Sequence, residues 1–192
     1  MEPTSETATS QGQETSKLVH RAIKGDVDAY GELYRIHLDR IYRYVFYLVG
    51  NTMMAEDITE EVFIKAWKAI KSCQGKESTF APWLYRIAHN HMVDTLKKSP
   101  KNASSQFNNS AESEDVAQRV EFSLECQKVI RLIADLPEPQ KQIMILKFLD
   151  GADNSEIEQI TGKRQGAIRA LQMRALITLR KRLNGEVNGN GA

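Results

Sequence analysis

The sequence has few cysteines and no long apolar run. Its 192 residues include 2 cysteines, Cys73 and Cys126, and neither belongs to a Cys-x-x-Cys pair, which excludes a disulfide framework and a cysteine-bound zinc site. No segment approaches the roughly 18 apolar residues of a membrane span, and the N-terminus lacks the basic start and apolar stretch of a signal peptide. These absences predict a soluble cytoplasmic protein with no membrane span.

Enzymatic and β-structural signatures are missing as well. The sequence contains no nucleophile–base constellation, glycine-rich phosphate loop or cluster of metal ligands, so we expect no enzyme, no catalytic residue, no metal and no cofactor. Short alternating polar and apolar segments joined by hairpin dipeptides are also absent. Because 41% of the residues are hydrophobic and many recur at helical spacing, we expect a folded chain of the all-α class.

Polar segments divide the chain into two small helical domains joined by a flexible linker. Both ends and the middle are rich in Ser, Thr, Gln, Asn or Glu and poor in residues that a core could bury. The predicted parts are a disordered leader at 1–15, a first domain at 16–98, the linker at 99–115, a second domain at 116–183 and a disordered tail at 184–192.

The first domain is predicted to form a helical bundle. Apolar residues recur at helical spacing over 26–49, 55–70 and 80–96. The middle helix opens with four acids whose charges suit the positive end of the helix dipole: Glu56, Asp57, Glu60 and Glu61. This acidic face remains available to a partner.

The second domain ends in a helix-turn-helix pattern. Asp153 precedes Glu156 by three residues, which is the spacing of a capping box at the start of a short helix. That helix is predicted to end at Gly162, and a final basic helix begins near Arg164. A short helix, a tight turn and a basic second helix are typical of a DNA-binding motif.

The final helix separates an apolar side from a basic side. At ~100° per residue, the apolar side gathers Ile168, Leu171, Ala175, Leu179 and Leu183. The opposite side gathers Gly166, Arg169, Ala170, Met173, Arg174, Ile177, Arg180 and Lys181. For an arbitrary helix, a solvated amphipathic surface would be the better interpretation. Here no acid occurs between residues 163 and 182, and the small outward residues leave room to enter a major groove, so we favour contact with duplex DNA.

One flank of the predicted helix at 80–96 combines an aromatic ring with bases and an amide. Its members are Trp83, Arg86, Asn90 and Lys97, a set that could stack against and hold an unpaired strand. The alternative is that Trp83 is a core residue and Arg86 a surface charge. His89 and His91 point to different sides of a helix, so we expect no metal site there and a half-buried His91.

These segments resemble the extracytoplasmic-function (ECF) sigma factors of the sigma-70 family, which guide bacterial RNA polymerase to promoters. In the first domain, AEDITEEVFIKAW at 55–67 and FAPWLYRIAHN at 80–90 are similar to the second conserved sigma region. In the second domain, Leu-Pro-Glu at 136–138 and GAIRALQMRAL at 166–176 are similar to the fourth. The resemblance implies a sigma factor that directs promoter recognition, DNA melting and transcription initiation.

The resemblance also implies roles for individual residues. It implies that the clamp helices of the polymerase β′ subunit contact Asp57, Glu60 and Glu61. The unpaired non-template strand of the minus-ten element would be captured by the helix that carries Phe80, Trp83, Arg86 and Asn90. The minus-thirty-five duplex would face Arg169, Ala170, Met173, Arg174 and Arg180. Further implied partners are the polymerase β subunit and an anti-sigma factor.

The sequence departs from the family pattern at several positions. Glu60 stands where Gln is usual, and Glu158 replaces a small Ala in the first helix of the helix-turn-helix. Leu171-Gln172 stands where many members have Arg-Leu, and Arg164 replaces a capping Ser or Thr. Glu158 and Gln172 bear on how the two helices of the motif pack.

A rival interpretation is a free-standing helix-turn-helix repressor that dimerises on a palindromic site. An acidic docking helix and an aromatic stripe have no task in such a repressor. A net charge of +1 also gives the chain little general attraction to DNA. Both features favour the sigma factor.

Overall fold

The protein is all-α in the part that a computed structural model describes, residues 5–73, 77–98 and 124–189. These ranges contain α-helices, one short 3-10 helix and one π-helical turn, and no strand. The predicted fold class is therefore confirmed. The predicted linker at 99–115 lies outside the described residues, as does the stretch 116–123 at the start of the predicted second domain.

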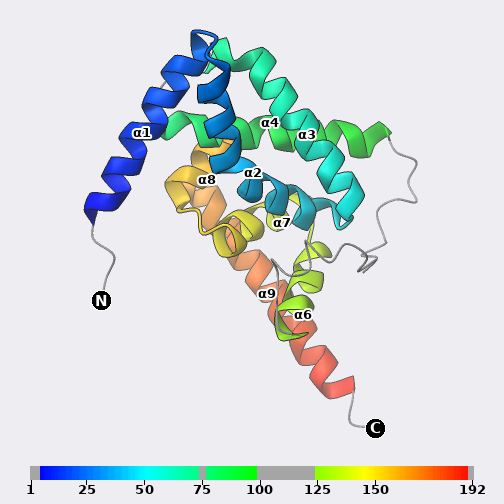
Figure 1. Cartoon of the computed structure of the whole chain (residues 1–192). Helices are drawn as coiled ribbons and strands as arrows, with labels where there is room; N and C mark the ends of the chain where they lie inside the picture. Colours follow the sequence, from blue (N-terminus) through cyan, green and yellow to red (C-terminus); the bar gives the residue numbers. More distant parts are fainter. Residues whose placement is uncertain (1–4, 74–76, 99–123, 190–192) are drawn as a thin grey trace.

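Four helices form the first half of the molecule (Figure 1): α1 (Ser5–Ile23), α2 (Val27–Val49), α3 (Thr52–Ala69) and α4 (Glu77–Lys98), with the 3-10 helix η1 (Ile70–Ser72) after α3. Asp26 caps α2 by accepting a hydrogen bond from the Ala29 amide, and Asn51 caps α3 in the same way. Gly50 ends α2 in a left-handed conformation with φ 71°. The three helices expected in this half are present.

The first half buries one face of each helix in a shared core. Leu33 and Ile41 of α2, Val62 of α3 and Leu84 of α4 are fully enclosed. The Tyr30 hydroxyl also donates a 2.6 Å hydrogen bond to the carbonyl oxygen of Phe63, which joins α2 to α3. This packing fixes which sides of α3 and α4 face outward.

The second half consists of α6 (Leu124–Ala134), α7 (Glu138–Met144), the π-helical turn η2 (Ile145–Leu149), α8 (Asn154–Thr161) and α9 (Gln165–Gly189). The predicted capping box at the start of α8 is confirmed, since the Asp153 carboxylate accepts from the Glu156 amide while the Glu156 carboxylate accepts from the Asp153 amide. Gly162 ends α8 with φ 70°. The expected helix-turn-helix is thereby formed.

The two departures within the helix-turn-helix have different structural outcomes. The Gln172 amide of α9 donates a 3.2 Å hydrogen bond to Asn154 Oδ1 of α8, so it ties the two helices together. Glu158 is only half-buried, which lets its carboxylate reach water while its carbonyl oxygen accepts from the Gly162 amide. The larger side chain is therefore accommodated at the edge of the motif.

Both chain ends are more helical than the sequence predicts. The leader at 1–15 is expected to be disordered, yet α1 begins at Ser5; the tail at 184–192 is expected to be disordered, yet α9 extends to Gly189. Val19 and Ala22 anchor the end of α1 in the core, and a helix propagates from a packed turn at little further cost.

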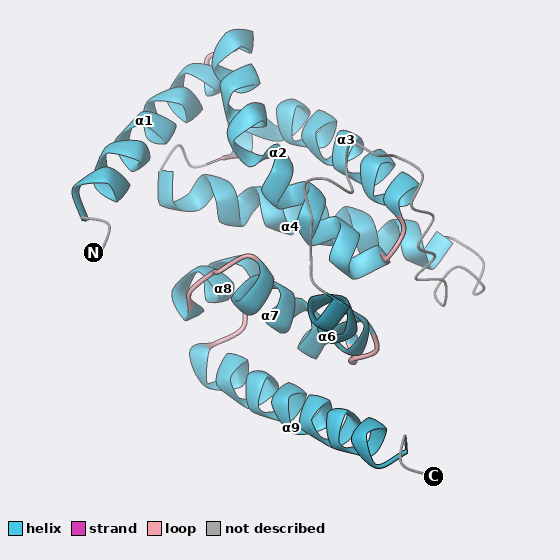
Figure 2. Cartoon of the chain, turned by 60° about the horizontal axis from the view of Figure 1, so that its bottom comes forward, coloured by secondary structure: helices cyan, strands magenta, loops and turns pink. Residues whose placement is uncertain are grey.

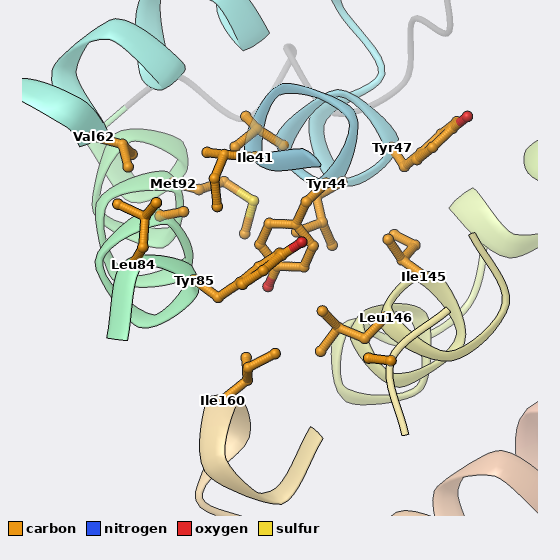
Figure 3. Packing of buried hydrophobic residues seen from close by; sticks show 14 of the residues in the cluster. Ile41, Tyr44, Tyr47, Val62, Leu84, Tyr85, Met92, Ile145, Leu146 and Ile160 are labelled. Atoms are coloured by element: carbon orange, nitrogen blue, oxygen red, sulfur yellow. The ribbon is translucent and has the colours of Figure 1, made fainter. Parts of the chain in front are cut away.

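The two halves pack against each other. Helix α4 lies against α8, and α2 lies against η2 and α6. Figure 3 shows Tyr44 and Tyr85 of the first half facing Ile145, Leu146 and Ile160 of the second. All five side chains are buried and belong to one continuous hydrophobic cluster. The two predicted domains are thus in close contact in the described structure.

Candidate nucleic-acid interface and acidic docking surface

The outward side of α9 carries the predicted duplex-binding residues. We call this set the basic arc: Arg169, Ala170, Met173, Arg174 and Arg180, all of them exposed. The opposite side of the helix is packed against α7 and α8 through Ile168, Ala175 and Leu179, which are buried. The separation of faces predicted from helical spacing is confirmed, except that Leu183, placed on the apolar side, is 42% exposed.

The charge of the basic arc is little compensated. The Arg169 guanidinium lies 3.4 Å from the amide oxygen of Gln165, a neutral partner. Farther along α9, Arg182 lies 3.4 Å from the carboxylate of Asp135, an ion pair at the edge of α6. Because α9 carries no acid between Gln165 and Leu183, its outward side presents a net positive surface suited to phosphates.

Helix α4 presents the predicted strand-binding stripe. Arg86 and Asn90 are exposed, and Trp83 is half-buried, with its ring 5.8 Å from that of Phe80. An indole that packs against Phe80 and is only half-buried leaves part of its ring free to stack against a base. The structure therefore brings Trp83, Arg86 and Asn90 together on one accessible flank.

Phe80 does not belong to this accessible flank. Its side chain is 0% exposed, and its ring lies 5.2 Å from the imidazole of His37 on α2. A ring enclosed in this way has no free face on which a base could stack in this arrangement. Phe80 instead supports Trp83 from the core side.

Helix α3 presents the predicted docking acids. We call this set the acidic surface: Asp57, Glu60 and Glu61, all of them exposed. The inward side of the same helix is held in the core by Ile58, Val62 and Ala66. The acidic surface is therefore fixed on a rigid helix, but it is open to a partner.

Glu61 is joined to α4 through His91. The Nε2 atom of His91 lies 2.9 Å from a carboxylate oxygen of Glu61, and the Lys65 ammonium lies 3.8 Å from the same oxygen. Lys65 also donates to Nδ1 of His91, so the Nε2–H tautomer can donate to Glu61. Burial and the Lys65 charge lower the pKa of His91. The expected half-buried His91 is confirmed, and it links α3 to α4.

Two buried polar groups were not predicted from the sequence. Burial lowers the pKa of His37 to about 4, and its Nε2 atom has no hydrogen-bond partner among the described residues. Asp150 accepts hydrogen bonds from Arg40 and Tyr85, which lie in the other half of the chain. The sequence around Asp150 indicates a helix end before Gly151 and carries no sign of partners so distant.

The described residues hold no group of three or more His, Cys, Asp or Glu side chains arranged to bind a metal ion. Within the same part of the chain, no helix combines the length and the apolar character needed to cross a bilayer.

The three surfaces occupy different parts of the fold. The acidic surface and the stripe on α4 lie on neighbouring helices of the first half, whereas the basic arc lies on α9. In Figure 2, α7 and α8 lie between α4 and α9. The two predicted nucleic-acid surfaces are therefore separated by one helical layer.

Sequence comparisons match both halves of the chain. Family models match residues 33–102 as Sigma-70 region 2 and residues 126–179 as Sigma-70, region 4. The ECF RNA polymerase sigma factor BldN of Streptomyces coelicolor is 33% identical over 180 residues, which cover 92% of this chain and 68% of BldN. The ECF RNA polymerase sigma factor SigW of Bacillus subtilis is 28% identical over 179 residues, which cover 87% of this chain and 95% of SigW.

Solved structures share the fold. CnrH, in complex with the cytosolic domain of CnrY, superposes with a TM-score of 0.70 at 20% identity, covering 90% of this chain and 98% of CnrH. The sigma factor RpoE from Bartonella quintana, in complex with the anti-sigma factor NepR, gives a TM-score of 0.63 at 20% identity, covering 82% of this chain and 98% of RpoE. The two family models and the 33% identity to BldN establish that the chain belongs to the ECF RNA polymerase sigma factor family.

Proposed function

We propose that the chain is a dissociable subunit that gives bacterial RNA polymerase its promoter specificity. The observation that carries the proposal is the presence, in one chain of the ECF sigma family, of an exposed acidic surface, an accessible Trp–Arg–Asn flank and an exposed basic arc. The acidic surface suits a contact with polymerase. The Trp–Arg–Asn flank suits an unpaired strand, and the basic arc suits a duplex. The subunit would act in the cytoplasm, without catalysis of its own.

The acidic surface is proposed to dock on the clamp helices of the β′ subunit. Asp57, Glu60 and Glu61 project from consecutive turns of a helix whose other side is buried, so a basic partner can approach without disturbing the core. The hydrogen bond from His91 restrains Glu61 on the side that faces α4. A partner that binds the Glu61 carboxylate would therefore also be linked, through His91, to α4, which carries the proposed strand-binding residues.

The remaining surfaces are proposed to hold promoter DNA. Trp83, Arg86 and Asn90 would capture the unpaired strand of the minus-ten element, because an aromatic face, a cation and an amide together suit an exposed base and its phosphate. The basic arc would enter the major groove of the minus-thirty-five element, as the second helix of a helix-turn-helix does. The polymerase β subunit and an anti-sigma factor are further proposed partners; RpoE, which shares the fold, was solved with such a factor.

The alternative of a dimeric repressor makes a different prediction about the acidic surface. A repressor would bind its operator equally well after the charge of α3 is reversed, whereas a sigma factor would lose its polymerase. The family membership of both halves favours the sigma factor.

A binding measurement with core RNA polymerase tests the proposal. Asp57→Lys combined with Glu60→Lys should lower the affinity of the chain for core polymerase by at least about tenfold at modest salt, because both charges face the partner. Glu14→Lys, on the exposed side of α1, is the matched control and should leave the affinity unchanged. Equal affinities for all three proteins would refute docking through α3.

A further inference from the structure

His91 anchors one member of the acidic surface from inside the fold. Its side chain is 11% exposed, whereas that of Glu61 is 59% exposed. The His91 Nε2 atom lies 2.9 Å from Oε2 of Glu61, across the contact between α3 and α4, which lie side by side in Figure 2. Glu61 therefore differs from a freely solvated surface acid, because an enclosed ring on a second helix holds its carboxylate.

The second partner of the imidazole fixes its tautomer. The Lys65 ammonium contacts Nδ1 of His91, and an ammonium can only donate a hydrogen bond. Nδ1 is therefore the acceptor, so the neutral ring carries its proton on Nε2 and donates it to Glu61. Burial and the nearby Lys65 charge lower the pKa of His91, which favours the neutral ring.

The contact with His91, and not the ion pair within α3, restrains Glu61. Lys65 follows Glu61 by four residues on the same helix, and its ammonium lies 3.8 Å from Oε2. Exposed pairs of this kind contribute little, because water screens the charges and two long side chains lose entropy. The enclosed imidazole has few positions available to it. Both contacts are to Oε2, so Oε1 stays open to a partner.

Protonation of the imidazole would change the charge of the acidic surface. A positive ring would form an ion pair with Glu61 and offset one of the charges that a basic partner meets. The proton on Nδ1 would also face the Lys65 ammonium, which would have to turn away. The charged groups that shift the pKa of the ring in the described chain are Glu61 and Lys65 on α3, and Asp94 and Lys98 on α4 itself.

We propose that His91 is a positioning residue for polymerase docking, which presents the Glu61 carboxylate to a basic partner while the imidazole is neutral and offsets its charge once the imidazole is protonated. The inference rests on the proposed docking of α3 on the polymerase. His91 acts through Glu61 and does not itself need to touch the polymerase. Docking should therefore weaken as the pH falls, to an extent that depends on this one side chain.

The affinity of the full-length chain for core polymerase at about pH 7.5 and about pH 5 tests the proposal, since the lowered pKa of His91 places its titration below 6.5. His91→Gln is the conservative variant, because an amide can donate to Glu61 and accept from Lys65 but cannot titrate. The native chain should match His91→Gln at the higher pH and bind at least about threefold more weakly than it at the lower pH. Taking the ratio of the two affinities cancels the titration of the polymerase itself.

A second variant removes the anchor altogether. His91→Leu should lower the affinity about threefold at the higher pH, because an unrestrained Glu61 side chain loses more rotamer freedom on docking. In a Glu61→Gln background the same substitution should have no further effect, since His91 acts through that carboxylate. Circular dichroism shows whether His91→Leu folds; if it does not, the comparison of the native chain with His91→Gln decides.

His20→Gln is the matched control. It makes the same exchange at an exposed histidine of α1, whose ring bonds to the carbonyl oxygen of Ser16. This variant should follow the native chain at both pH values. Any difference between the native chain and His91→Gln is then specific to the histidine beside the acidic surface.

Nuclear magnetic resonance of the free chain tests the pair without polymerase. The imidazole nitrogen shifts of His91 should show a proton on Nε2 and none on Nδ1. The pKa of His91 should fall in Glu61→Gln, because the Glu61 charge raises it. The opposite tautomer, or the same pKa in both proteins, would contradict the pairing on which the proposal depends.

The result is separable from that of the proposed function. If the native chain binds core polymerase and its affinity keeps the same ratio to that of His91→Gln at both pH values, the positioning role is overturned and the docking stands. If neither the native chain nor His20→Gln binds core polymerase at either pH, the proposed docking is contradicted and the positioning role falls with it.

Discussion

Phe80 and Trp83 lie three residues apart on α4, but their surroundings differ. The Phe80 ring is enclosed beside His37, whereas the Trp83 ring is half-buried and borders the exposed Asn90 side of the helix. Helical spacing predicts that Trp83 and Asn90 share a flank, and they do. It cannot predict that α2 covers Phe80, because that contact joins residues distant in the sequence.

Trp83→Ala and Asn90→Ala should reduce promoter opening more than duplex binding. A base can stack on an aromatic ring only after it has left the duplex, and this contact is worth ~1–3 kcal/mol per base. Permanganate reactivity of promoter thymines in the holoenzyme measures the opening. A thermal melt of each variant is the control, and loss of folding on Trp83→Ala would show that the ring serves the core instead.

His37 should make folding stability depend on pH. Its pKa is lowered from 6.5 to about 4 by burial, so between these values the unfolded chain binds more protons than the folded chain. The free energy of unfolding is therefore highest above pH 6.5, where His37 is neutral in both states. It falls as the pH is lowered, by about 2 kcal/mol from pH 7 to pH 5. Urea unfolding at the two pH values measures it.

The matched variant for this prediction is His37→Gln, which keeps a polar side chain but cannot titrate. The variant should lose less stability than the native chain between the two pH values, by the amount given above. Identical pH dependence in both proteins would show that His37 does not control acid stability.

At the scale of elements, local capping signals predict the bounds of a short capped helix better than the full length of the long helices at the two chain ends. Asp153, Glu156 and Gly162 correctly predict the bounds of α8, since each acts on backbone groups within a few residues. The early start of α1 and the late end of α9 depend on packing and propagation along the helix. Composition alone, which is polar at both ends, points the other way.

Arg169 should read a base in the major groove. It lies near the start of α9 on the exposed side, in the position from which the second helix of a helix-turn-helix contacts base edges. Arg169→Ala should cost roughly 1–3 kcal/mol and relax the preference at one upstream promoter position. Selection by holoenzyme from a library randomised across the minus-thirty-five element measures both effects.

Arg180 provides the comparison within the same helix. It is exposed about three turns farther along α9, where we expect a phosphate contact. Arg180→Ala should weaken all promoters similarly and reduce the salt slope by about 1. An Arg169→Ala holoenzyme with native affinity, sequence preference and salt slope would be incompatible with docking of α9 in the groove.

At the scale of the whole molecule, the sequence predicts two helical units but not how they meet. The Asp150 carboxylate accepts hydrogen bonds from Arg40 across 110 residues and from Tyr85 across 65 residues. Each of these residues has an ordinary local interpretation: a helix end, a surface arginine and a tyrosine of a helical bundle. Their convergence depends on the path of the intervening chain, which no local pattern encodes.

Three exposed surfaces lie on one chain, and each suits a different binding partner. The acidic surface, the Trp83 flank and the basic arc are useful together only if one molecule carries DNA-reading groups to the polymerase. A repressor would need the basic arc alone. The three surfaces together therefore favour a role in the initiation of transcription, beyond binding of DNA or of polymerase alone.

The most direct test is in vitro transcription with purified core RNA polymerase, the purified chain and fragments of genomic DNA. Sequencing the 5′ ends of the transcripts shows where initiation occurs. We predict initiation at discrete sites that share an upstream and a downstream element, only when the chain is present, and its loss with Asp57→Lys combined with Glu60→Lys. A chain that binds core polymerase yet produces no site-specific transcripts would contradict the account.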